Sequence, residues 1–171
     1  MIMRVTYLLI LCVGFSCSSK NPASEAELGV SSTQKEGNTD LQQADPQIAL
    51  DFINAYLAND NSDHQRMEIR EWVSQNALVT DQFKVELVDL ISKAWERDPE
   101  YGLGYDPILM AQDSPEQFEL SAFNAENGLV RVNGVRWKDF DLSLKVVLVD
   151  GKTYVDGCGE INMEPQYQVE R

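Results

Sequence analysis

Apolar side chains in the first half of residues 45–171 recur every three or four positions, the spacing that places them on one face of a helix. Asp45 and Pro46 are typical of a helix start, because Asp can accept hydrogen bonds from free amides and Pro fits the first turn. The first helix then carries Ile48, Ala49, Phe52, Ile53, Tyr56 and Leu57 on its apolar face. After a shorter helical segment at residues 67–73, Thr80 can cap another helix. Its apolar face holds Phe83, Leu87, Leu90, Ile91, Ala94 and Trp95.

Beyond Gly102 the apolar positions alternate with polar ones, which is the pattern of strands with one buried face. The alternating residues are Phe118 and Leu120, then Val130 and Val132, then Phe140, Leu142, Leu144, Val146 and Leu148. Gly128 and the pair Asp150-Gly151 supply the positive φ angles that tight hairpins require. Helices followed by hairpins predict one α+β domain at residues 45–171. We expect two or three helices packed on one face of a curved antiparallel sheet of about four strands.

The start of the chain has the pattern of a secretory signal. Arg4 precedes an apolar run at residues 5–15, which is shorter than the roughly 20 residues needed to span a bilayer. Small Ser16 and then Cys17 follow, an order that resembles the bacterial lipoprotein signal. We therefore expect a signal peptide at residues 1–16 and acyl chains on Cys17 that anchor the protein to a membrane. The alternative is an ordinary secretory signal with an incidental cysteine.

Residues 17–44 are rich in Ser, Asn, Gln, Glu and Thr, with few large apolar side chains. Such a segment cannot bury enough surface to offset its ordering entropy, so we expect a lipidated, disordered tether. Ser18 follows the cysteine in place of Asp, which resembles lipoproteins sent to the outer membrane. The expected location is the bacterial cell envelope. Cys12 is a weaker lipidation candidate than Cys17, because bulky Leu11 precedes it.

Three stretches of the folded region resemble a known family. They are FINAYL at residues 52–57, YDPILMAQD at residues 105–113 and KVVLVDGKTYVD at residues 145–156. Together they resemble the domain of unknown function 3828, which occurs in bacterial lipoproteins and periplasmic proteins. The resemblance implies an α+β fold, similar to the nuclear-transport-factor-two-like or cystatin-like cones. The family has no agreed activity, so the resemblance implies no catalytic residues.

The formal net charge of −14, without a basic run, argues against a nucleic-acid partner. His64 is the single histidine of the chain, and Cys158 is the single cysteine after residue 17. Standard spacings for a metal site, a disulfide or a redox pair are therefore absent from the sequence, and we expect no metal and no cofactor. The pattern predicts that Cys158 is a buried residue of a strand and that His64 is solvated.

Four residues after the predicted helices form a candidate cleft: Tyr105, Asp106, Gln112 and Asp113. A cone-shaped α+β fold can hold a ligand between sheet and helices, and a buried Asp beside a Tyr or His can transfer a proton. The other interpretation is that Asp106 and Asp113, near Pro and Gly, are turn residues that accept hydrogen bonds from backbone amides. The sequence identifies no catalytic constellation.

The three tryptophans are candidates for a carbohydrate or peptide platform. Trp72 and Trp95 lie on apolar helix faces, so the pattern favours the core for both. Trp137 lies between Arg136 and Lys138 at a strand start, and we expect it to be exposed.

Two functions are open at this point. The first is a non-enzymatic, lipid-anchored envelope protein that binds another envelope component or a small ligand. The alternative is a small hydrolase or isomerase that uses a cavity between sheet and helices. A closed pocket around a carboxylate with a raised pKa favours the enzyme, whereas carboxylates that cap backbone amides at the surface favour the binding module.

Overall fold

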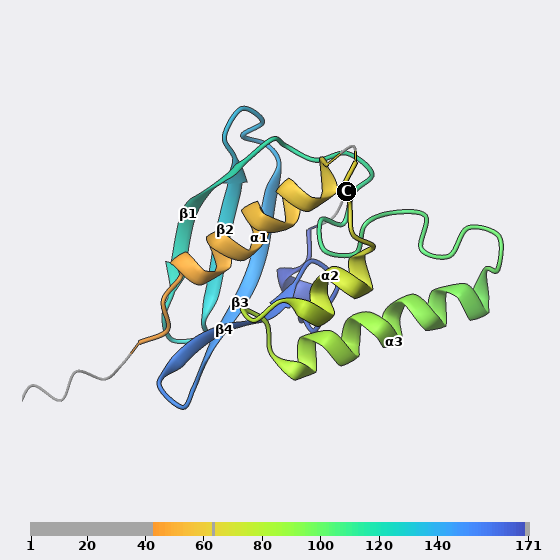
Figure 1. Cartoon of the computed structure of the whole chain (residues 1–171). Coiled ribbons are helices and arrows are strands. Elements are labelled where there is room, and N and C mark those ends of the chain that lie inside the picture. Colours follow the sequence, from red (N-terminus) through yellow and green to blue (C-terminus); the bar gives the residue numbers. More distant parts are fainter. Residues whose placement is uncertain (1–42, 63, 170–171) are drawn as a thin grey trace, which may run out of the picture. The chain divides into compact units, whose positions relative to one another are not determined.

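The computed structural model describes residues 43–62 and 64–169, and within them three α-helices precede a four-stranded antiparallel sheet (Figure 1). The elements are α1 (Gln47–Asp60), α2 (Ile69–Gln75), α3 (Asp81–Arg97), β1 (Phe118–Asn124), β2 (Leu129–Gly134), β3 (Asp141–Val149), β4 (Lys152–Cys158) and the 3-10 helix η1 (Pro165–Tyr167). The strand order is β1-β2-β3-β4. The predicted α+β class is thus confirmed. The expected signal peptide, Cys17 and most of the tether lie outside the described residues.

Both predicted helix starts use the side chains that the sequence indicated. Asp45 Oδ1 accepts a hydrogen bond from the amide of Gln47 at 2.9 Å, just before α1. Thr80 Oγ1 accepts from the amide of Phe83 at 3.1 Å and caps α3, and the same hydroxyl donates to Asp156 in β4 at 2.8 Å. The second cap therefore also ties α3 to the sheet.

A single apolar core lies between α1 and the sheet and extends beneath α3. Helix α1 crosses one face of the sheet and contacts β1, β3 and β4, while α2 and α3 lie beside each other next to β4 (Figure 1). The largest fully buried side chains are Tyr56, Phe52, Phe83, Phe118, Ile53, Leu57, Leu87, Ile108, Leu109, Leu142, Leu144 and Ile161. The apolar faces of the helices and of the strands thus pack against each other in one core.

Part of the segment after β4, from Met163 to Tyr167, packs on the opposite face of the sheet. Lys145 and Gly157 are paired in the β3-β4 ladder, on the face away from Leu144. A Cβ on Gly157 would lie 2.8 Å from the sulfur of Met163. Ser143 points to the same face and is buried. The sequence pattern did not predict this second layer.

Three apolar residues that were predicted to be buried are exposed: Leu120, Trp95 and Leu148, which is 38% exposed near the end of β3. Leu120 lies opposite buried Val132, but it belongs to the outermost strand and is 41% exposed. Trp95, in the last turn and a half of α3, is 49% exposed. That end of α3 extends beyond the sheet (Figure 1). Gly102 of the following loop approaches the indole, where a Cβ would lie 3.0 Å from the ring. The prediction of a core role for Trp95 was wrong.

The two edges of the sheet are covered in different ways. Along β4, Val155 exchanges backbone hydrogen bonds with the segment before α3, donating to Leu78 and accepting from Thr80. Along β1, the side chain of Asn54 in α1 donates to the carbonyl of Phe118 at 3.1 Å and accepts from its amide at 2.8 Å. A register shift between residues 120 and 122 interrupts the rest of β1.

Replacing Gly128 by Ala is expected to destabilise the domain far more than replacing Gly104 by Ala. Both glycines have left-handed φ angles, 69° and 70°, which cost an L-residue about 1–2 kcal/mol. A Cβ at residue 128 would also lie 2.1 Å from the carbonyl oxygen of Val146, whereas nothing lies within 4 Å at residue 104. Urea unfolding of both variants should show a further loss of ~1–3 kcal/mol for Gly128→Ala. Equal losses would contradict the close approach of β3 to this turn.

Candidate functional site

The stretch from residue 105 to residue 113 folds into a tight turn that Asp106 organises. Asp106 Oδ1 accepts hydrogen bonds from the amides of Ile108 and Leu109, at 2.8 and 3.0 Å. The backbone closes the same turn, because Met110 N donates to Asp106 O and Asp106 N donates to Ala111 O. The predicted turn-forming role of Asp106 is confirmed.

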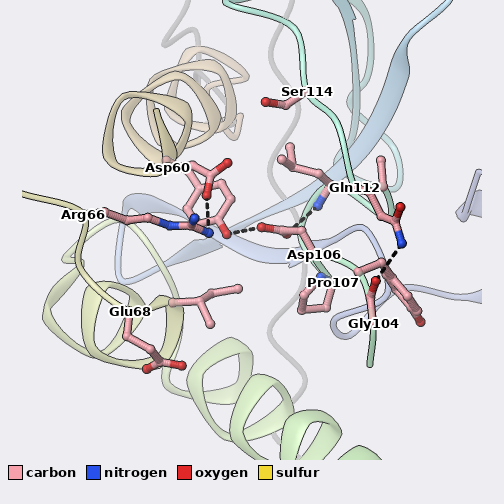
Figure 2. Close-up of a pocket in the computed structure, with 13 residues that line it drawn as sticks. Asp60, Arg66, Glu68, Gly104, Asp106, Pro107, Gln112 and Ser114 are labelled. Atoms are coloured by element: carbon pink, nitrogen blue, oxygen red, sulfur yellow. Dashed lines mark hydrogen bonds and ion pairs between the residues drawn. The ribbon is translucent and has the colours of Figure 1, made fainter. Parts of the chain in front are cut away.

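The second oxygen of Asp106 faces the first cavity of the site. Asp106 Oδ2 accepts a short hydrogen bond from the hydroxyl of Tyr56 in α1, while an ion pair joins Arg66 to Asp60 at 2.6 Å (Figure 2). This cavity, which we call the Asp106 cavity, has a volume of about 700 Å³. Its polar lining comes from Tyr56, Asp60, Arg66, Glu68, Tyr105, Asp106, Gln112 and Ser114.

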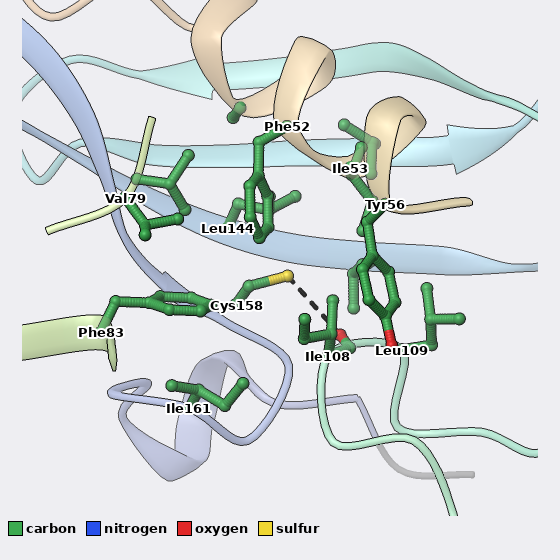
Figure 3. Close-up of a cluster of buried hydrophobic side chains, with 14 of the residues drawn as sticks. Phe52, Ile53, Tyr56, Val79, Phe83, Ile108, Leu109, Leu144, Cys158 and Ile161 are labelled. Carbon is green, nitrogen blue, oxygen red and sulfur yellow. Dashed lines mark hydrogen bonds between the residues drawn. The ribbon is translucent and has the colours of Figure 1, made fainter. Parts of the chain in front are cut away.

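The Asp106 turn is attached to the core through the buried side chains of Ile108 and Leu109. Ile108 and Leu109 are buried beside Tyr56, and the thiol of Cys158 points to the carbonyl of Ile108, at 3.5 Å (Figure 3). The amide of Glu160 donates to the carbonyl of Pro107 at 3.0 Å. Burial raises the pKa of the Cys158 thiol, so the sulfur is a protonated core residue and not a nucleophile. The predicted burial of Cys158 is confirmed.

Burial raises the pKa of Asp106 above its ordinary value, although the hydrogen bonds from Tyr56, Leu109 and Ile108 act in the opposite direction. Burial and the neighbouring carboxylate of Asp106 also raise the pKa of Tyr56. The tyrosine therefore stays protonated and donates. Asp106 caps two backbone amides, but it is partly buried and does not lie at the surface. It therefore meets the pKa criterion for the enzyme and only part of the criterion for the binding module.

A second cavity adjoins the first and shares Tyr105, Ala111 and Gln112 with it. We call it the Trp137 cavity, and its volume is about 830 Å³. Its lining residues are Tyr105, Met110, Ala111, Gln112, Asp113, Trp137, Asp139, Phe140, Asp141 and Val169. The Asp106 turn thus forms the wall between two hollows of the surface.

Two aromatic rings of the Trp137 cavity are held in place but exposed. Trp137 is 46% exposed, and its indole packs edge-on against buried Phe140 with ring centroids 5.1 Å apart. Tyr105 is 38% exposed, and its hydroxyl bonds to Glu160. Burial and Glu160 raise the pKa of Tyr105 to about 12. Gln112 Nε2 donates to the carbonyl of Gly104 at 3.0 Å, which fixes the amide beside these rings.

The structure brings the predicted candidate residues together around this turn. Asp106 lies in the first cavity, Asp113 and Trp137 in the second, and Tyr105 and Gln112 in both. Asp113 is exposed and caps no backbone amide within the described residues, so the turn-forming prediction for it was wrong. His64 is exposed in a turn, as predicted, and lines neither cavity.

The sequence analysis missed the partners of Asp106. Tyr56 was predicted only as an apolar residue of a helix face, and Asp60 and Arg66 were not considered. A buried tyrosine hydroxyl needs a hydrogen-bond partner, so the position of Tyr56 on the core face was a usable signal. Trp72, predicted to be in the core, is partly buried and packs against Phe52 at 5.6 Å between ring centroids.

Nowhere in residues 43–62 and 64–169 do three His, Cys, Asp or Glu side chains gather closely enough to hold a metal ion. Over the same residues, no helix combines the length and apolar composition that a membrane crossing requires.

Comparison with known proteins leaves the function open. No protein-family model matches the chain, and no curated protein matches it. A solved structure of a protein of unknown function from Bacteroides thetaiotaomicron VPI-5482 is similar, with a TM-score of 0.43 and 22% identity. The match covers 65% of this chain and 85% of the other.

Proposed function

We propose that the protein is a lipid-anchored, non-enzymatic binding module of the bacterial cell envelope. The observation that carries the proposal is the Trp137 cavity, where two fixed and exposed aromatic rings flank an amide and carboxylates. Ligand sites are typically concave, with aromatic walls and a few polar groups that orient the ligand. The volume of about 830 Å³ falls within the range of such sites.

The contacts of Asp106 support binding over catalysis. A carboxylate has about four acceptor positions, and three are used by Ile108, Leu109 and Tyr56. A general base needs a free oxygen directed at its substrate. Asp106 is better suited to hold the wall between the two cavities in a fixed shape.

The proposed location rests on the amino-terminal sequence. The charge at Arg4, the apolar run and the Ser16-Cys17 pair follow the order of a lipoprotein signal. Together with the stretches at residues 52–57, 105–113 and 145–156, this order supports membership of the domain of unknown function 3828 family. In this proposal the segment before residue 43 links the lipid anchor at Cys17 to the folded domain.

The binding function is tested by capture from detergent-solubilised envelopes with the intact lipidated protein as bait. Trp137→Ala is expected to lose the captured ligand or partner, because the variant removes the main ring of the cavity. Trp95→Ala is the matched control, since this indole is equally exposed but lies on α3 and lines neither cavity. Equal capture by the wild type and both variants would contradict a binding role for the Trp137 cavity.

A small hydrolase or isomerase is the second candidate, and the raised pKa of Asp106 favours it. Its catalytic site would be the Asp106 cavity, with Tyr56 as the proton donor beside the carboxyl group. This function predicts turnover of a chromogenic ester that rises with pH through the pKa of Asp106. The turnover would be lost in Asp106→Asn, whereas absence of turnover in the wild type would contradict it for esters.

A further inference from the structure

The aromatic side chains of the Trp137 cavity, Trp137 and Tyr105, are held in place by contacts within the protein. Phe140 is only 3% exposed and supports the Trp137 indole from one side at an interplanar angle of 68°. Tyr105 is held at its hydroxyl by Glu160, which comes from the segment after β4. Because both side chains are already fixed, a ligand that packs on them loses little affinity to ordering.

The polar groups of this cavity accept hydrogen bonds more than they donate them. Gln112 uses its amide nitrogen on Gly104, and its amide oxygen has no hydrogen-bond partner among the described residues. The carboxylates of Asp113 and Asp139 line the same cavity. A matching ligand must therefore offer several donors around an apolar face.

A sugar ring has this combination of surfaces. Its C–H groups form an apolar face that can pack on an indole or phenol ring, and its hydroxyl groups donate around the edge. An organic cation would also be attracted by the carboxylates. Arg136 and Lys138 on either side of Trp137 are each paired with a glutamate, and neither lines the cavity. The aromatic walls and the amide oxygen of Gln112, which is free among the described residues, favour the sugar, and the titration below includes a cation as the competing outcome.

We propose that the Trp137 cavity binds a sugar ring of a glycan, stacked on Trp137 and hydrogen-bonded to Gln112 and Asp113. The inference rests on the proposed binding function and names its ligand class. The Asp106 cavity continues from the same wall through Tyr105 and Gln112, so an oligosaccharide can extend from one cavity into the other. The expected ligand is thus a chain of neutral sugars and not a single monosaccharide.

The test is isothermal titration of the mature chain, in detergent micelles, with maltohexaose, chitohexaose, cellohexaose and mannohexaose. At least one of these sugars should bind saturably, with little change between low and high salt, because the contact is not an ion pair. Trp137→Ala should weaken binding about tenfold or more, equal to about 1.4 kcal/mol. Gln112→Ala, at an exposed position, provides a second variant with little risk to folding, and Trp95→Ala should bind like the wild type.

Each other outcome overturns the inference. If none of the four sugars binds, or if Trp137→Ala binds them like the wild type, the cavity is not a glycan site. If spermidine binds instead and high salt abolishes its binding, the ligand class is an organic cation. In either case, loss of envelope capture by Trp137→Ala would still support the proposed binding function, so the two failures are distinguishable.

Discussion

Replacing Cys17 by Ser is expected to move nearly all of the protein out of the membrane fraction, or to leave it unprocessed with residues 1–16 attached. The reason is that the cysteine sulfur is the proposed acylation site, and each buried CH₂ of an acyl chain contributes about 0.8 kcal/mol to anchoring. Fractionation, with mass spectrometry of the amino-terminal peptide, measures the effect. Stable anchoring requires two such chains, so partial loss of acylation should already release protein.

Cys12→Ser is the matched control for this experiment. Cys12 lies inside the apolar run after bulky Leu11, so its loss should change neither processing nor anchoring. An unmodified amino terminus at another residue, or equal anchoring of the Cys17→Ser protein, would contradict the lipoprotein proposal. The ordinary secretory signal would then explain the apolar run.

Asp106→Ala is expected to destabilise the domain by about 2–4 kcal/mol in urea unfolding, the largest loss of any single polar substitution proposed for this site. The variant removes the acceptor of three hydrogen bonds and leaves the buried hydroxyl of Tyr56 without its partner. Asp113→Ala, seven residues along the same stretch, is exposed and should change stability by no more than about 0.5 kcal/mol. Equal effects of both variants would show that Asp106 does not hold the turn.

Asp106→Asn removes the ionisable group of this residue but keeps the size of its side chain, so it tests the effect of the charge on stability. In the folded chain the pKa of Asp106 is raised above 3.8, so the folded state holds this proton more tightly than the unfolded state. The stabilising contribution of the protonated carboxyl is complete below pH 3.8 and is lost as the pH rises through the raised pKa. The wild type should therefore lose stability relative to Asp106→Asn over this interval, and parallel pH profiles of the two proteins would contradict it.

Local features of the fold were predictable because their causes lie within a few residues. Asp45 and Thr80 precede apolar runs of helical spacing. In the structure Asp45 accepts a hydrogen bond from the first amide of α1, and Thr80 caps α3. Gly128 and Asp150-Gly151 have the positive φ angles that their hairpins require. Element type and order follow from these signals, so the α+β class could be read before any contact was known.

Features that depend on the extent of a neighbouring element were not predictable. Trp95 has the correct spacing for the apolar face of α3, but the helix is longer than the surface it covers. Leu120 alternates correctly, yet it lies at the edge of the sheet. Periodicity gives the direction of a side chain and not what lies opposite it.

The candidate site was predicted in part for the same reason. Residues 105–113 were selected together because they are close in sequence, and the structure keeps Tyr105, Asp106 and Gln112 in one turn. The contact between Tyr56 and Asp106 spans 50 positions of sequence, and a pattern within one element cannot show it. Trp137 joins the site through the sheet, which brings the start of β3 beside the turn.

The side chain of Asn54 has a consequence for the membrane anchoring that we propose. By bonding both backbone groups of Phe118, it occupies positions at which a strand of another molecule could begin to pair with β1. The register shift after Leu120 breaks the rest of that edge. Anchored molecules meet far more often in two dimensions than free ones in solution. If the chain is anchored as proposed, an edge closed in this way would keep neighbouring copies from pairing through β1.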